Sequence, residues 1–240
     1  MKTALITGAN KGIGFETAKQ LAELGYFVYI GSRDKAKGIQ ATEKLKALGL
    51  INIDCVELDV TKIDSIKSAR QELEDKIPQL DILVNNAGIL GTVPQPAATV
   101  SVDEIRRIFD TNFFGTIQVT QAFIPLLQKS EAGRIVNVTS GLSSLTLHND
   151  PSWKYYNFKS AGYSVSKTAL NAYTVMLAFG LKDTNIKVNV VDPGHTATDF
   201  NNYRGELTPE HSAKVIVKYA TIDIDAPTGK LFDEHGEMPW

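Results

Sequence analysis

Short apolar runs alternate with longer amphipathic segments along most of the chain. The runs are Ala4–Thr7, Phe27–Ile30, Ile53–Leu58, Ile82–Val84, Arg134–Val138 and Lys187–Val191. Because they are short and bounded by turn residues, they predict buried strands. Between them, in segments such as Lys62–Ile77, apolar residues recur every three or four positions, which predicts helices. Strands that alternate with helices require parallel crossovers, so we expect an α/β fold with one doubly wound, mainly parallel sheet covered by helices on both faces.

Two segments interrupt this alternation. One is Ile89–Val102, which contains Pro94 and Pro96, and the other is Gly141–Gly162, which carries an aromatic cluster. Both follow predicted strands, so both are expected to overhang the crevice at the carboxyl ends of the sheet. No linker rich in proline, glycine or serine divides the 240 residues. We therefore expect residues 1–240 to form a single domain that binds the cofactor and carries out catalysis.

The composition excludes several classes of function. Lysine and arginine total 25, and aspartate and glutamate total 27, with no long run of either sign. Neither nucleic acid nor a membrane is therefore an expected partner. The single cysteine, Cys55, has no internal disulfide partner, and the four histidines lack metal-ligand spacing. We expect a metal-free protein, and the lack of a secretory or membrane-spanning apolar run favours the cytoplasm.

A glycine-rich segment, Thr7–Gly14, joins the first predicted strand to the first predicted helix. Gly8 would allow a sharp turn, Gly12 a close approach of phosphate, and Gly14 tight helix packing. A pyrophosphate would then lie at the helix N-terminus, where free amides and the helix dipole attract anions. An ordinary glycine-rich turn is the alternative. The position after the first strand favours a dinucleotide site.

The end of the second strand bears on the choice of cofactor. Ser32 stands where a carboxylate would bind the ribose of NAD, and Arg33 follows it. A guanidinium group matches the oxygens of a 2′-phosphate, and Lys11 would add a second charge, so NADP(H) is favoured over NAD(H). Alternatively, Arg33 and Lys11 are solvated surface charges, and Asp34 pairs with Arg33 or reaches the ribose itself.

Polar and small residues end the third and fourth strands. Asp59 would address the adenine amino group while Val60 packs on the ring, and the small Ala87 and Gly88 would let the backbone after Asn86 approach the ribose. Aspartate, asparagine and glycine also dominate turns, so each residue alone is compatible with turn chemistry. Their occurrence at successive strand ends favours a cofactor site.

Tyr163 and Lys167 lie four residues apart in a predicted helix and therefore share one face. Lowering a tyrosine pKa from about 10 to about 7 requires roughly 4 kcal/mol, and a cation about 4 to 5 Å away supplies about 3 to 4 kcal/mol. One lysine is therefore nearly sufficient to tune Tyr163 for acid/base chemistry. Taken alone, the spacing favours a surface pair worth about 0.2–0.5 kcal/mol, and the other motifs of the chain favour the chemical role instead.

In order and spacing, these motifs together resemble the short-chain dehydrogenase/reductase family over essentially the whole chain. The matching residues are Thr7–Gly14, Asn85–Gly88, Ser140, Tyr163–Lys167 and Pro193-Gly194. The glycine loop and the ending from Pro227 to Asp233 and on to Trp240 are most similar to NADPH-dependent carbonyl reductases. The resemblance implies a Rossmann fold and hydride transfer by a bound nicotinamide.

The resemblance also implies a role for each site residue. Tyr163 would be the general acid, Lys167 would lower its pKa and hold the ribose, Ser140 would bind the substrate oxygen, and Asn112, in an expected helix Val102–Lys129, would hold a relay water. The residues expected to contact the cofactor are Gly8, Asn10, Lys11, Gly12, Ile13, Gly14, Ser32, Arg33, Asp59, Val60, Asn86, Ala87, Gly88, Tyr163, Lys167, Pro193, Gly194 and Thr196.

Several assignments have alternatives. Thr139, Ser143 and Ser144 compete with Ser140, and Asn112 could close a local helix bond instead. His195 is expected to line the cleft or to be exposed rather than to be catalytic. The aromatic residues Trp153, Tyr155, Tyr156 and Phe158 would either wall a substrate pocket or anchor their loop.

The leading hypothesis is therefore an NADPH-dependent reductase of a ketone or aldehyde. The alternatives are a ketoacyl-carrier-protein reductase, although no basic docking patch is evident, and a non-catalytic NADP(H)-sensing module.

By analogy with the family, a homodimer or homotetramer is expected, built on the helices that hold Asn112 and Tyr163. Apolar residues available for it are Phe113, Phe114, Val119, Phe123, Ala169, Tyr173 and Phe179. The polar segment Asn201–His211 is expected to close over substrate, and a helix is expected after Thr208.

Overall fold

The computed structural model describes all residues, 1–240, and contains one eight-stranded sheet in the order β3-β2-β1-β4-β5-β6-β7-β8. Every neighbouring pair is parallel except the antiparallel pair β7 and β8. The strands are β1 (Thr3–Thr7), β2 (Phe27–Ser32), β3 (Ile53–Glu57), β4 (Ile82–Asn85), β5 (Arg134–Val138), β6 (Lys187–Val191), β7 (Leu231–Asp233) and β8 (Gly236–Glu237). The chain crosses from β3 to β4 on the far side of β1, which is the doubly wound topology that the sequence predicts.

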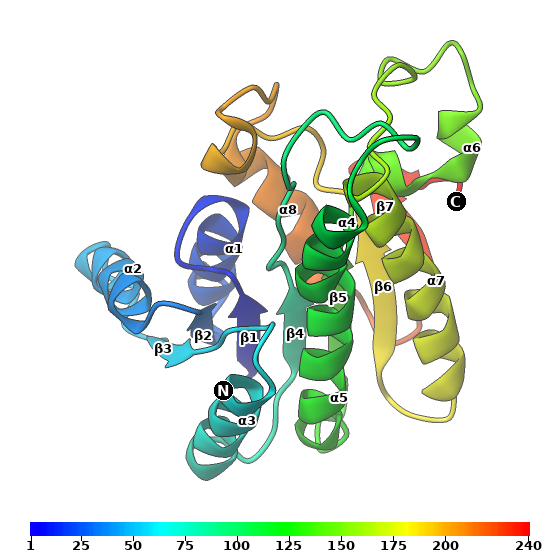
Figure 1. Ribbon diagram of the computed structural model, residues 1–240. Helices are drawn as coiled ribbons and strands as arrows, with labels where there is room; N and C mark the ends of the chain where they lie inside the picture. The colour runs from blue at the N-terminus through cyan, green and yellow to red at the C-terminus, as the bar shows by residue number, and fades with distance from the viewer.

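Helices cover both faces of this sheet (Figure 1). One face packs against α1 (Gly12–Glu23), α2 (Lys35–Ala47) and α8 (Pro209–Ala220). The other packs against α3 (Ile63–Lys76), α5 (Thr116–Leu127) and α7 (Tyr163–Gly180). Each face has its own apolar core, and the buried strands supply residues to both because successive side chains point to opposite faces.

The expected helix Val102–Lys129 differs from the structure. It consists of α4 (Val102–Phe109), a π-helical segment Asp110–Gly115, and α5. At Gly115 the helix meets Val60 so closely that a Cβ atom would lie 2.9 Å from the Val60 carbonyl oxygen. Segments of π-helix hold an extra residue per turn and are frequent at functional sites. Here the π-helical segment contains Asn112, whose side chain is fully buried.

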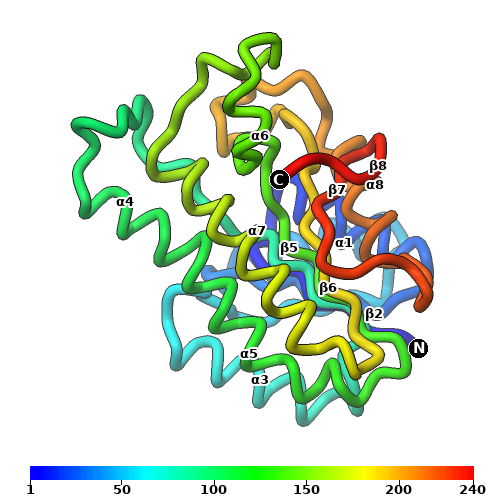
Figure 2. The backbone as a smooth tube through the Cα atoms, turned by 90° about the vertical axis from the view of Figure 1, so that its right-hand side faces the viewer, coloured from blue at the N-terminus to red at the C-terminus, as the bar shows by residue number.

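The loops at the carboxyl ends of the strands lie together at one edge of the sheet, at the top of Figures 1 and 2. The Gly141–Gly162 loop includes α6 (Leu145–His148), and the end of the chain lies beside it, where the Thr146 amide donates to the Trp240 carbonyl at 2.9 Å. None of the helices is both long and apolar enough to span a lipid bilayer.

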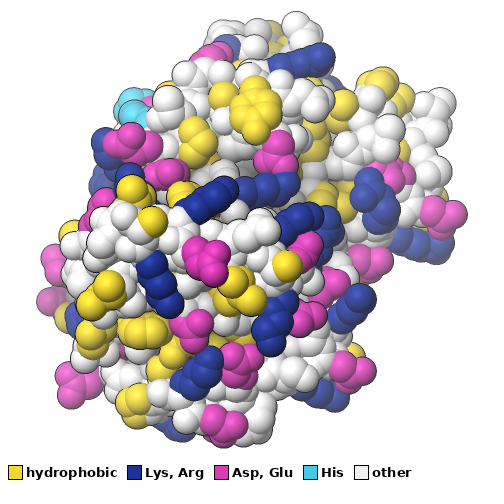
Figure 3. All heavy atoms as spheres, turned by 90° about the vertical axis from the view of Figure 1, so that its left-hand side faces the viewer, with side chains coloured by type: hydrophobic (Ala, Val, Ile, Leu, Met, Phe, Trp, Pro, Cys, Tyr) yellow, Lys and Arg dark blue, Asp and Glu magenta, His cyan; other side chains and the backbone are white.

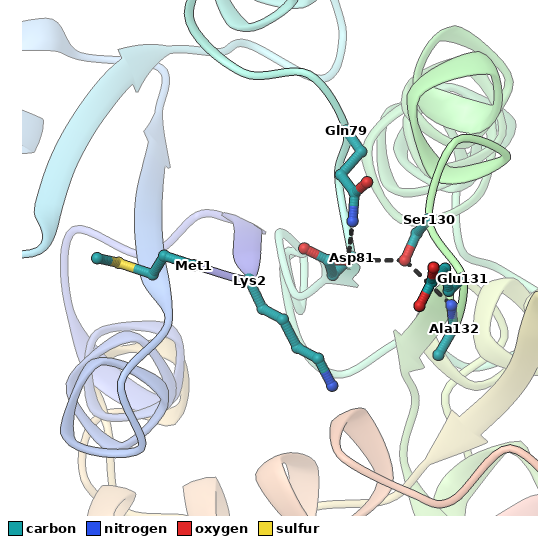
Figure 4. Close-up of a pocket in the computed structure, with 7 residues that line it drawn as sticks. All are labelled: Met1, Lys2, Gln79, Asp81, Ser130, Glu131 and Ala132. Atoms are coloured by element: carbon teal, nitrogen blue, oxygen red, sulfur yellow. Dashed lines mark hydrogen bonds between the residues drawn. The ribbon is translucent and has the colours of Figure 1, made fainter.

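A surface pocket of about 300 Å³ lies at the opposite edge of the sheet and contains none of the predicted site residues (Figure 4). Its buried carboxylate, Asp81, accepts hydrogen bonds from the Thr3 amide at 2.7 Å, from Gln79 at 2.8 Å and from Ser130 at 2.7 Å. Both carboxylate oxygens are therefore engaged in holding β1, β4 and the α5–β5 loop together. The Asp81 carboxylate in this pocket therefore has a structural role.

Candidate active site

Tyr163 is the first residue of α7, and Lys167 follows one turn later on the same face. Both are buried, at 7% and 4% exposure, and the Lys167 Nζ atom lies 6.0 Å from the centre of the Tyr163 ring. The alternative of an exposed surface pair is therefore excluded. The i, i+4 spacing brings the two groups together as the sequence predicts.

The expected direction of the tyrosine pKa is wrong for this structure. Burial raises the pKa of Tyr163, the negative charge of Asp192 raises it further, and a hydrogen bond with Ser140 opposes the change. The Lys167 ammonium donates instead to the Val138 carbonyl at 2.8 Å, and burial lowers the pKa of Lys167 to about 8. Burial removes both groups from water and so acts against both charged forms, an effect that the spacing of the two residues does not reveal. The phenol therefore stays protonated at neutral pH.

Ser140 is distinguished from its neighbours by what each hydroxyl contacts. Ser140 is the hydroxyl that opposes the rise in the Tyr163 pKa, and it also caps the short helical turn that follows it, since its Oγ accepts from the Leu142 amide at 3.2 Å. Ser143 donates to the Ser140 carbonyl at 2.6 Å, and Ser144 caps α6 through the Leu147 amide. The geometry supports the choice of Ser140 over the competing hydroxyls.

Asn112 reaches across the fold instead of closing a local helix bond. Its Oδ1 accepts from the Ile89 amide at 2.8 Å, and its Nδ2 donates to the Ile89 carbonyl at 2.9 Å and to the Ser166 hydroxyl at 3.1 Å. A Cβ atom at Gly88 would lie 3.3 Å from Asn112 Oδ1 and 3.6 Å from Lys167 Nζ. The missing side chain at Gly88 thus leaves the space between these two residues open.

The glycine loop has the features that a pyrophosphate requires. Gly8 and Gly12 adopt φ angles of +64° and +59°, which favour glycine. A Cβ atom at Gly14 would lie 2.9 Å from the Ala9 Cα atom, so only glycine permits this packing. No side chain caps the N-terminus of α1. Its free amides therefore suit the anionic pyrophosphate of a dinucleotide, and the residues present fit such a cofactor.

Thr7 ties the glycine loop to the end of β4. Its Oγ1 atom accepts from the amides of Asn86 at 3.0 Å and Ala87 at 2.9 Å, while Asn86 Nδ2 donates to the Thr7 carbonyl at 2.9 Å. Two of the predicted cofactor segments therefore form one rigid unit. The role of Thr7 was not predicted, although a polar residue ending a buried strand is a signal for it.

Arg33, directly after β2, has no ion-pair partner. Ser32 is buried and donates to the Asp34 carbonyl at 2.8 Å. Asp34 caps α2 through the Lys37 amide at 3.1 Å and pairs with the Lys37 ammonium at 3.4 Å, so it is not the partner of Arg33. Arg33 is exposed, and no carboxylate lies within ion-pair distance of it. Figure 3, viewed from the side of α2 and β3, shows Lys and Arg side chains along the border of a hollow.

Asp59 and Val60 are held firmly after β3. Burial raises the pKa of Asp59, but hydrogen bonds from Thr61 and the nearby Lys62 outweigh it, so the pKa of this carboxyl lies below its usual value. Val60 is 7% exposed and packs against Gly115. The carboxylate is therefore ionised and fixed in place.

The segment after β6 contacts both the glycine loop and the start of α7. Lys11 forms an ion pair with Asp199, and the adjacent Phe200 ring meets the Tyr163 ring edge-on, with 5.7 Å between centres. Thr196 is buried and lies 2.5 Å from the Ser212 hydroxyl, while Gly194 takes a φ of +79°. A helix begins at Pro209 with Thr208 as its cap, as predicted.

The aromatic residues of the Gly141–Gly162 loop contact one another in a row. His148, Trp153, Tyr155 and His195 meet edge-to-face in that order, with ring centres 5.4, 5.5 and 5.7 Å apart. The row joins the loop after β5 to the loop after β6. This favours loop anchoring for Trp153 and Tyr155, and His195 has no base-orienting partner, as expected.

Asp192 was missed by the sequence analysis. It directly follows β6 and accepts from the Gly194 amide at 3.0 Å, and its other carboxylate oxygen lies against Gly141, where a Cβ atom would be 3.0 Å away. Burial raises the pKa of Asp192 to about 6. The carboxylate thus joins the loop of Ser140 to the loop of Pro193. A charged residue between a buried strand and a Pro-Gly pair was the available signal.

Comparisons with known proteins identify the family of the chain. Residues 2–207 match the family described as short chain dehydrogenase. Short-chain dehydrogenase/reductase 1 of Saponaria officinalis is 34% identical over 293 aligned positions, which cover 99% of this chain and 95% of that protein. Because the alignment is longer than this chain, that relative carries insertions absent here.

Solved structures show the same architecture. Salutaridine reductase from Papaver somniferum superposes with a TM-score of 0.85 at 30% identity, over 98% of this chain and 100% of the other. The NADPH-bound carbonyl reductase from chicken fatty liver gives 0.87 at 26% identity, over 100% and 99%. The chain therefore belongs to the short-chain dehydrogenase family, whose members are oxidoreductases that bind a nicotinamide cofactor.

Proposed function

We propose that the protein is an NADPH-dependent reductase that converts a ketone or aldehyde to an alcohol and also catalyses the reverse oxidation. The observation that carries the proposal is a buried, protonated Tyr163 at the start of α7, one turn from the buried Lys167, with Ser140 near enough to influence its pKa. Such a phenol is a proton donor in a site that excludes water.

Each residue of the proposed site has its own role in the reaction. The nicotinamide, when bound, supplies a hydride to the carbonyl carbon. Tyr163 gives its proton to the carbonyl oxygen, and the Ser140 hydroxyl binds that oxygen as negative charge develops. Lys167 stabilises the phenolate that remains, and the buried Asn112 holds the water through which the proton is replaced. In alcohol oxidation the same groups act in reverse.

A substrate panel tests this proposal. Purified protein is mixed with NADPH and a set of ketones, aldehydes and quinones, and NADPH oxidation is followed together with alcohol formation. We expect turnover of at least one carbonyl compound with one alcohol formed per NADPH consumed. Tight NADPH binding without any turnover would support a sensing module instead, and selective turnover of ketoacyl thioesters would support a ketoacyl reductase.

Arg33 is proposed to select NADPH through its 2′-phosphate. The support is its exposure and its lack of an ion-pair partner, whereas Asp34 is held by Lys37. Arg33→Ala is expected to raise the KM for NADPH about 10- to 100-fold, equivalent to about 1.4–3 kcal/mol, while the KM for NADH changes little. Arg106→Ala, which removes an exposed arginine from α4, is the control. An unchanged ratio of the two KM values would remove Arg33 from cofactor selection.

We also propose a homodimer or homotetramer. Of the apolar residues considered for this role, Val119 and Phe123 face the sheet, whereas Phe114 and Phe179 are 48% and 69% exposed. Exposed residues of α7 form one stripe, since Val165, Ala172, Met176 and Phe179 are separated by seven, four and three positions. Light scattering is expected to give twice or four times the 26.2 kDa of one chain. A mass of one chain would contradict this proposal.

A further inference from the structure

The helix that carries Tyr163 begins without a capping side chain of its own. Its N-cap is Gly162, so the first amides of α7 need an acceptor from elsewhere in the fold. Gln95 supplies it from the Ile89–Val102 loop. Its Oε1 atom accepts from the Gly162 amide at 3.1 Å, from the Tyr163 amide at 2.9 Å and from the Ser160 hydroxyl. Gln95 is 1% exposed, so water cannot replace these contacts.

The amide nitrogen and the backbone carbonyl of Gln95 are also held by hydrogen bonds. Its Nε2 atom donates to the Leu90 carbonyl at 2.8 Å, and its backbone carbonyl accepts from the Ala161 amide at 3.0 Å. Two glycines leave space for the side chain. A Cβ atom at Gly91 would lie 2.9 Å from Nε2, and one at Gly162 would lie 2.9 Å from Oε1. The Gln95 side chain therefore has one available position.

The same loop also holds the second buried polar residue of the site. Ile89, six residues before Gln95, exchanges two backbone hydrogen bonds with the Asn112 side chain. Asn112 in turn donates to Ser166 of α7. One loop thus connects Asn112 to the first turn of α7, and its displacement would move both groups relative to each other.

We propose that Gln95 is a positioning residue for proton transfer, because it fixes the first turn of α7 and with it the Tyr163 hydroxyl. The inference rests on the proposed role of Tyr163 as proton donor. Gln95 touches neither the reacting atoms nor the glycine loop, so its effect falls on the chemical step and leaves cofactor binding unchanged. A displacement of about 1 Å in such a group lowers the rate by about 10²-fold.

Three variants test the proposal. Gln95→Met keeps the length of the side chain and removes the acceptor, and Gln40→Met removes an exposed glutamine from α2 as the control. Gln95→Glu keeps the acceptor and, because burial keeps its carboxyl protonated, also a donor toward the Leu90 carbonyl. The kcat of Gln95→Met is expected to fall about 10²-fold with the KM for NADPH within about 2-fold. Gln95→Glu should restore most of the rate, and Gln40→Met should match the wild type.

Amide hydrogen exchange gives a readout that needs neither cofactor nor substrate. In Gln95→Met the amides of Gly162 and Tyr163 should lose protection while the middle of α7 keeps it, and Gln95→Glu should retain it. Rates are measured well below the unfolding temperature of each variant. If Gln95→Met does not fold, Gln95→Asn is used instead. Its side chain is shorter by one methylene, so the acceptor oxygen lies farther from the Gly162 and Tyr163 amides, and the same changes are expected to be smaller.

The outcomes separate this inference from the proposed function. A wild-type protein that reduces no carbonyl compound would overturn both. An active wild type whose Gln95→Met variant keeps its kcat, or loses kcat and cofactor affinity together without rescue by glutamate, would overturn the positioning role alone.

Discussion

Tyr163→Phe is expected to lower kcat for carbonyl reduction by about 10²–10⁴-fold, the usual contribution of a positioned general acid. The phenylalanine ring fills the same space, so the edge contact with Phe200 and the burial at the start of α7 are kept. The loss therefore reports the hydroxyl alone. Steady-state NADPH oxidation with the best carbonyl substrate measures it.

A matched variant controls for the removal of any buried phenol. Tyr219→Phe deletes a buried hydroxyl of α8 that donates to the Asp233 carbonyl at 3.0 Å and is not part of the proposed site. Its kcat should stay near that of the wild type, and both variants should bind NADPH with unchanged affinity. A Tyr163→Phe variant within about 10-fold of the wild-type kcat would remove this residue from proton transfer.

Lys167→Met is expected to lower kcat by about 10²–10³-fold and yet to stabilise the fold. The rate falls because the cation that stabilises the phenolate is lost. The fold gains because burial lowers the pKa of Lys167 to about 8, so keeping the charged form buried at pH 7 opposes folding. The free energy of unfolding should rise by about 1–3 kcal/mol at pH 7, after allowance for the lost hydrogen bond to Val138. Denaturant unfolding measures it, with exposed Lys214→Met as the control.

The pH dependence of that difference follows from the lowered pKa. Between pH 8 and 10.5 the unfolded chain holds the Lys167 proton while the folded protein releases it. The unfolded state thus binds more protons, and the free energy of unfolding of the wild type rises with pH across this window. The advantage of Lys167→Met should shrink over the same range. Suppose instead that Lys167→Met is less stable than the wild type at pH 7 and that the difference in free energy of unfolding does not change with pH. Burial of the Lys167 ammonium would then not oppose folding.

Regular elements and motifs within them were predictable from the sequence because their signals are local. Apolar runs identified β1 to β6 to within two residues at each end, and the i, i+4 spacing of Tyr163 and Lys167 was enough to place them together. β7 and β8 were not predicted. They have three and two residues, which is too short for a period to be recognised.

The parts that were not predicted depend on contacts between distant segments. Gln95 lies in a loop without periodicity, and its partners at the start of α7 are more than 60 residues away. The π-helical segment around Asn112 arises where Gly115 meets Val60. The raised pKa of Tyr163 reflects burial and the charge of Asp192, which requires three-dimensional structure. Spacing alone therefore predicted that Tyr163 and Lys167 lie close together, but it gave the wrong direction for the Tyr163 pKa.

The most direct test of the account is a single-turnover reduction with NADPH deuterated at the transferred position, in water and in D₂O. We predict that the product alcohol carries deuterium on its carbinol carbon, that the step slows with either isotope, and that Tyr163→Phe loses the step while it still binds NADPH. Label transfer at the same rate in both solvents, retained in Tyr163→Phe, would contradict proton donation by Tyr163.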